Sequence, residues 1–115
     1  MPLPSEIQTL IDQLNQELDQ IEAEARGGID VSRLLLVRFP NNARLTGLFA
    51  TLNNALLFVD NFRGRIQTTI ERISSTNVSI EAVQEAGEDL SEFLGLVVDA
   101  KIMVSRTISI LEDLQ

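Results

Sequence analysis

Apolar residues recur every seven positions along two long stretches of the chain. The first series is Leu45, Leu52, Val59, Ile66 and Ile73, and the second is Val83, Leu90, Val97, Val104 and Leu111. Each series has apolar companions three or four residues further on, which is the spacing of a helix face that packs against other helices. The pattern predicts long helices over residues 43–73 and 80–114. We expect Asn41 or Asn42 to cap the first and Ser79 to cap the second.

A third apolar stripe lies near the start of the chain, where acidic and amide residues fill the other positions. Ser5 is an expected N-cap, with Gln8 three residues later completing a capping box. Gly27 and Gly28 are expected to end this helix. The stripe is made of Ile7, Leu10, Ile11, Leu14, Leu18, Ile21 and Ala25.

Residues 31–39 are the least determined part of the pattern. Asp30 is able to cap a short helix there, and Pro40 closes it. The run from Leu34 to Val37 also suits a buried strand, since periodicity does not separate the two at this length. We favour a helix because the chain has no other strand candidate with which a lone strand would pair.

The lengths of these segments predict the architecture. At about 1.5 Å per residue, the two long helices span roughly 46 and 52 Å, and the first helix with the 31–39 segment approaches the same length. We therefore predict an all-α, elongated antiparallel helical bundle of three columns, forming one domain over residues 1–115. The first column is broken at Gly27-Gly28, which makes four helices when the short segment is counted.

Composition excludes several kinds of chemistry. The chain has no Cys and no His, so it lacks a disulfide scaffold, thiolate metal ligands and the commonest general base. Its net charge of −8 argues against binding nucleic acid or an anionic membrane surface. We read no secretory signal and no apolar run long enough to span a bilayer, so the expected location is the cytoplasm. We expect no cofactor and no bound metal.

The charge is distributed in three blocks. Residues 1–25 carry a net charge of −6, residues 26–72 carry +4, and residues 73–115 carry −6. A middle helix that runs antiparallel to both neighbours would place opposite charges along both seams. Each exposed pair adds only about 0.2–1 kcal/mol, so the distribution selects an arrangement more than it stabilises one.

Apolar residues on the two long helices exceed what three columns are able to cover. Leu56, Leu57, Phe58 and Val59 are consecutive, and Leu96, Met103 and Ile110 repeat beside the core series. A helix that is apolar nearly all round must be covered on several sides, so we expect self-association into a dimer or a higher species. The alternative is that the 31–39 segment covers the excess within one chain. The expected interface residues are Leu57, Phe58, Arg63, Gly64, Arg65, Leu96, Met103 and Ile110.

Two polar groups are candidates for chemistry. The first is an acidic row, in which Glu88-Asp89-Leu90-Ser91-Glu92 loosely resembles the first half of the carboxylate motif of the all-α nucleotide pyrophosphohydrolases related to MazG. The second half of that motif is missing, and the row lies opposite the core seam, so we read it as a solvated face. The second candidate is Arg63-Gly64-Arg65, whose arginines we expect to pair with the chain's own acidic helices. The acidic row, the first of these two candidates, consists of Glu81, Glu85, Glu88, Asp89, Glu92 and Asp99.

The function that these observations favour is a protein–protein interaction module without enzymatic activity: an adaptor, an assembly factor or a small regulator. Its expected partners are a second copy of itself and another protein, with no nucleic acid and no membrane. The alternative is a metal-dependent all-α nucleotide phosphohydrolase that uses the carboxylate row. A binding module for an apolar ligand is a third option, and it requires a cavity.

Overall fold

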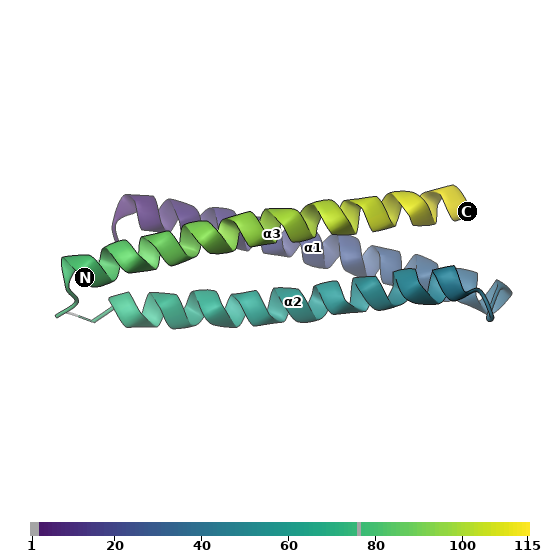
Figure 1. Cartoon of the computed structure of the whole chain (residues 1–115), viewed down its shortest axis with the longest axis horizontal. Coiled ribbons are helices and arrows are strands. Elements are labelled where there is room, and N and C mark those ends of the chain that lie inside the picture. The colour runs from purple at the N-terminus through teal and green to yellow at the C-terminus, as the bar shows by residue number, and fades with distance from the viewer. Residues whose placement is uncertain (1–2, 76) are drawn as a thin grey trace.

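A computed structural model describes residues 3–75 and 77–115 of the chain. It contains three helices, α1 (Ser5–Arg38), α2 (Ala43–Ile73) and α3 (Ile80–Leu114), which pack against one another in a body of 59 × 18 × 17 Å. The chain reverses direction at each of its two connections, and all three helices run along the long axis (Figure 1). Helix α1 packs more extensively against α2 and α3 than these two pack against each other. The prediction of an all-helical fold is confirmed for the described residues.

The heptad series form the core as the pattern predicts. All five members of the first series are buried, and four members of the second are buried while Val83 is half-buried. Helix α1 contributes its predicted stripe to the same core. Aromatic rings reinforce the contact between α2 and α3, where Phe62 lies edge-on to Phe93 with ring centroids 5.4 Å apart.

The prediction that the first column is broken at Gly27-Gly28 is wrong. Helix α1 is continuous through Gly27 and Gly28, so residues 31–38 extend α1 and there is no separate fourth helix or strand in the described residues. Neither glycine has the positive φ that a terminating glycine adopts. The reason is packing: a Cβ on Gly28 would lie 2.4 Å from Cδ1 of Ile108 and 2.7 Å from Cδ1 of Leu52. Gly28 therefore lets three helices approach one another closely.

Two of the predicted N-caps are confirmed and two are wrong. The side chain of Asn42 accepts from the Leu45 amide at 3.1 Å, and that of Ser79 accepts from the Ala82 amide at 3.0 Å. Ser5 is instead the first residue of α1, because the carbonyl of Pro4 already accepts a helical hydrogen bond from Gln8. The Gln8 side chain donates to Asp12, so no capping box forms. The expected cap at residue 30 lies inside α1.

Candidate interaction surfaces

The outer faces of all three helices carry exposed apolar side chains. Such residues are ordinary when they occur singly and informative when they are contiguous. The large ones are Leu34, Val37, Phe39, Leu57, Ile80, Leu96, Val98, Ile102, Met103 and Leu114. Their grouping on each helix therefore decides which surfaces are candidates for contact with a partner.

The predicted stripe on α3 is exposed along most of its length. Leu96 and Met103 are 45% and 48% exposed, and Ile110 is half-buried. Each follows by three residues a residue that faces the core; the first of these is Phe93, which packs on α2. The stripe thus lies on the side of α3 next to α2. These two helices pack less extensively against each other than either does against α1.

A second apolar strip occupies the opposite flank of the same half of α3. Val98 and Ile102 are exposed and line a shallow hollow together with Ile110 and the stems of Lys101 and Arg106. The C-terminal half of α3 therefore carries apolar side chains on both sides of its buried face.

The α2 residues of the predicted interface differ sharply from one another. Phe58 is half-buried, with its ring centroid 4.4 Å from that of Phe62, so it belongs partly to the core. Leu57 is 68% exposed. Its neighbours one turn away are Asn53, Asn54, Asp60 and Asn61, so it is an isolated apolar side chain on a polar face.

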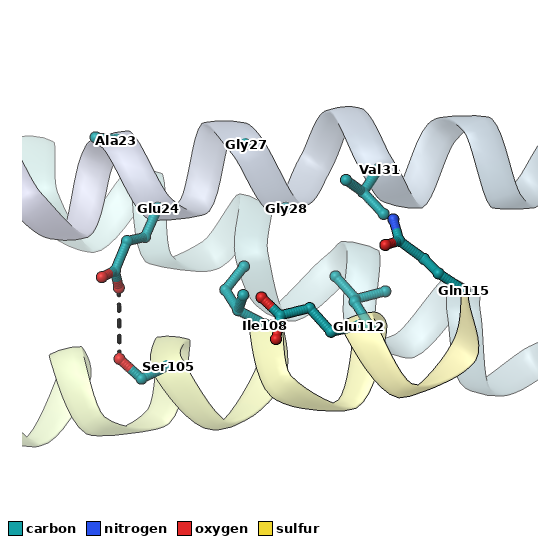
Figure 2. A pocket seen from close by; sticks show the side chains of 10 residues that line it. Ala23, Glu24, Gly27, Gly28, Val31, Ser105, Ile108, Glu112 and Gln115 are labelled. Atoms are coloured by element: carbon teal, nitrogen blue, oxygen red, sulfur yellow. Dashed lines mark hydrogen bonds between the residues drawn. The ribbon is translucent and has the colours of Figure 1, made fainter.

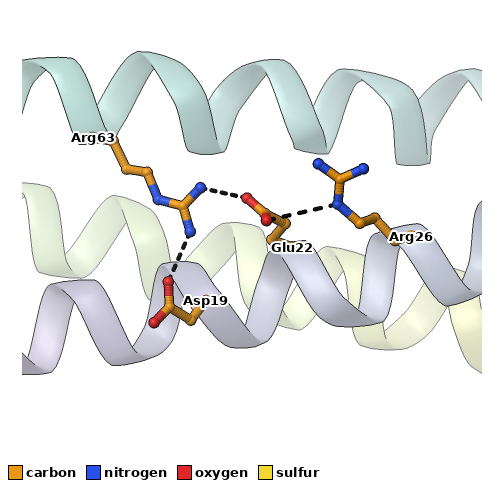
Figure 3. A network of polar contacts seen from close by, with 4 residues as sticks. All are labelled: Asp19, Glu22, Arg26 and Arg63. Carbon is orange, nitrogen blue, oxygen red and sulfur yellow. Dashed lines mark hydrogen bonds and ion pairs between the residues drawn. The ribbon is translucent and has the colours of Figure 1, made fainter.

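Arg63 is held by acids of its own chain, as Figure 3 shows. Its guanidinium donates to Asp19 at 2.7 Å and to Glu22, both on α1. The hydrogen bond to Glu22 is the largest cause of a raised Arg63 pKa, opposed by desolvation and supported by Asp19. Glu22 also pairs with Arg26 at 3.6 Å. This network joins α1 to α2, so the expected pairing of Arg63 with an acidic helix of its own chain is confirmed.

The other two residues of that motif have different surroundings. The guanidinium of Arg65 lies 5.1 Å from the Phe62 ring centroid, a cation–π contact that covers the edge of the core. Gly64 is exposed, and a Cβ added there would meet nothing within 4 Å. The motif therefore does not form one arginine patch.

A second interhelical ion pair is better shielded from water. Nζ of Lys101 on α3 lies 2.9 Å from Oε2 of Glu17 on α1, and the two side chains are only 30% and 20% exposed. That oxygen is buried and accepts no hydrogen bond of good geometry. Its stabilisation in the fold therefore comes from the charge of Lys101.

The acidic row on α3 forms no metal cage. Asp89 pairs with Arg72 at 3.0 Å, and the other members lie on exposed or edge positions of one helix. Within residues 3–75 and 77–115, no group of three or more acidic side chains converges in a way that could hold a metal ion. The reading of this row as a solvated face is consistent with that geometry.

The continuous α1 creates a surface that the sequence pattern does not predict when Gly27-Gly28 is taken as the end of a helix. Its outward face is polar in the N-terminal half, with Thr9, Asp12, Gln16 and Gln20, all exposed. From residue 23 onward the same face carries Ala23, Gly27, Val31, Leu34 and Val37, all exposed except the half-buried Val31. Their spacing of four, four, three and three residues places them on one stripe. We call residues 23–38 with this stripe the α1 outer face.

A groove follows the α1 outer face where it meets α3. Its first part, about 420 Å³, lies between Ala23, Gly27 and Val31 on one side and Ser105, Ile108 and Glu112 on the other (Figure 2). Its second part, about 480 Å³, continues along Leu34, Leu35, Val37 and Arg38. Val31 and Gln115 line both parts, so the two hollows are adjoining.

No protein-family model matches the chain, and no curated protein or solved structure is significantly similar to it. No helix in residues 3–75 and 77–115 has an apolar stretch long enough to cross a bilayer. The interpretation of the surfaces therefore depends on their own chemistry.

Proposed function

We propose that this chain is a non-enzymatic protein–protein interaction module, serving as an adaptor, an assembly factor or a small regulator, and that it self-associates through its helix faces. In this proposal three antiparallel helices form a rod, and its outer faces bind partner proteins. The observation that supports it is the set of exposed apolar stripes on α1 and α3, since grouped apolar side chains on a surface mark sites of contact with a partner.

The alternative of a self-contained monomer required residues 31–39 to cover the excess apolar surface. This segment instead continues α1 to Arg38 and exposes three more apolar side chains, with Leu34 72%, Val37 82% and Phe39 53% exposed. It therefore adds to the apolar surface, which supports an association between chains.

The test is the solution mass of the protein, measured by light scattering and sedimentation velocity over a range of concentrations, with and without Mg²⁺. We expect a dimer or higher species that is indifferent to the metal. A strict monomer at every concentration would refute self-association. Assembly that depends on Mg²⁺ would contradict the proposal and point to the carboxylates of α3.

A pair of variants then assigns the α3 stripe. Met103→Glu places a charge in the exposed apolar stripe, whereas Gln84→Glu adds the same charge at an exposed position outside it. If the α3 stripe is an interface, only Met103→Glu lowers the mass, and both variants retain wild-type helicity. Equal masses for the two variants would remove the α3 stripe from the interface.

A further inference from the structure

The two adjacent glycines of α1 have opposite surroundings. A Cβ on Gly28 would collide with the core, whereas a Cβ on Gly27 would meet nothing within 4 Å. A glycine within a helix costs about 1 kcal/mol relative to alanine, so Gly27 weakens α1 with no benefit to packing in the single chain. A surface glycine that borders an apolar groove suits the close approach of another backbone.

The α1 outer face is complementary to itself when two copies run in opposite directions. Small residues, Ala23 and Gly27, lie at one end, and protruding residues, Leu34 and Val37, lie at the other. Antiparallel packing that sets Leu34 of each copy against Gly27 of the other places a two-fold axis between residues 30 and 31. Each Leu34 then enters the hollow beside Gly27, and both hollows are filled at once.

The charges that flank the stripe support the same register. Arg38 makes no salt bridge within the described part of the chain, and in this register it lies beside Glu24 of the second copy. The two-fold axis repeats this pair, giving two oppositely charged contacts. Charges at the flanks of an apolar seam set the choice of partner and the orientation of paired helices.

We infer that the α1 outer face, residues 23–38, is the docking site for a second copy of this chain, which binds antiparallel with Leu34 of each copy seated against Gly27 of the other. The inference rests on the proposed self-association and names the surface that carries it. The occupant is a second copy because the face supplies both the protruding leucine and the hollow that receives it, and both members of the charged pair Glu24–Arg38.

The first experiment compares two leucines of similar exposure on different helices. Leu34→Asp should raise the dimer dissociation constant at least about tenfold, because the charge enters an apolar seam twice in each dimer. Leu57→Asp, on the isolated α2 position, should leave the dissociation constant unchanged. A dimer that survives Leu34→Asp and dissociates with Leu57→Asp would overturn the docking site while leaving self-association intact. A wild-type chain that is monomeric throughout would overturn both.

The second experiment tests the register through charge exchange. Glu24→Arg and Arg38→Glu should each weaken the dimer on the order of tenfold, and the double variant should recover most of the loss because the flanking pairs re-form with reversed sign. Circular dichroism of each single variant controls for folding. Additive weakening in the double variant would contradict the pairing of these two residues.

The third experiment measures orientation. The chain has no Cys, so Gln16→Cys provides a single position for a nitroxide label at an exposed site outside the stripe. Residue 16 lies about 14.5 residues from the two-fold axis, so the two copies of residue 16 are about 29 residues apart along the helices. At about 1.5 Å per residue, their Cα atoms are about 44 Å apart in the dimer. Pulsed electron spin resonance should find a distance near this value. A separation near the width of two helices would indicate parallel packing and refute the inference.

Discussion

Alanine substitutions at the two adjacent glycines of α1 should have opposite effects on stability. Gly27→Ala adds a methyl group where nothing lies within 4 Å, so only the helix propensity changes. Alanine is favoured over glycine in a helix interior by about 1 kcal/mol. For a domain of this size that gain raises the Tm by about 4 °C.

Gly28→Ala gains the same propensity but meets two methyl groups. Its Cβ would lie 2.4 Å from Cδ1 of Ile108 and 2.7 Å from Cδ1 of Leu52. Ile108 is half-buried and lines the groove, so its side chain has space to rotate away. Leu52 is fully buried, so its displacement disturbs the core. Overpacking of this kind costs about 1–3 kcal/mol, and we expect a net loss of up to about 2 kcal/mol.

The assay is urea and thermal unfolding followed by far-UV circular dichroism, at a protein concentration low enough to keep the chain dissociated. Leu52→Val serves as the matched test of the mechanism, because it removes the methyl group that the new Cβ meets. Its cost should be smaller in the Gly28→Ala background than in the wild type, which a double-mutant cycle measures. If Gly28→Ala is as stable as Gly27→Ala, the packing explanation for the continuous helix is wrong.

Three further predictions concern polar side chains. Ser79→Ala and Asn42→Ala should each lower the free energy of unfolding by about 1 kcal/mol, whereas Ser5→Ala should change it by less than about 0.5 kcal/mol, since only the first two accept a capping hydrogen bond. Lys101→Met should destabilise the fold by about 1–3 kcal/mol in urea titrations, because it leaves a buried carboxylate oxygen without its counter-charge. Arg63→Gln should cost about 0.5–1 kcal/mol at low ionic strength and less in high salt, because its carboxylate partners are in part solvated; a loss that does not vary with salt would contradict that assignment.

The features that could be predicted from the sequence are those with a local or periodic signal. Heptads identify the core faces of α2 and α3 because one side of a long helix must be apolar when it packs against two others. Asn42 and Ser79 were predictable as caps because a side chain reaches an amide two or three residues away, whatever the rest of the fold does. Ser5 failed the same rule because Pro4 supplied the first helical carbonyl one residue earlier.

The surface residues were harder to predict because exposure depends on the rotation of each helix in the bundle. Leu57 and Phe58 are neighbours in an apolar run, yet one is largely exposed and the other packs against Phe62. The pairing of Arg63 with an acidic helix of its own chain was predictable from the charge blocks, but its two partners on α1, Asp19 and Glu22, were not. These outcomes depend on which helices are adjacent, which no single helix pattern contains.

The missed α1 outer face has the same origin as the wrong helix break. Ala23 and Leu34 lie on one stripe only if the helix continues without interruption between them, so reading Gly27 and Gly28 as a terminator divides the stripe into two unrelated parts. The distinction between a glycine that ends a helix and one that permits contact lies in its neighbours. At Gly28 these are Leu52 and Ile108, which are far away in the sequence. At Gly27 the chain supplies none within 4 Å, and in the docking that we propose the neighbour is Leu34 of a second copy.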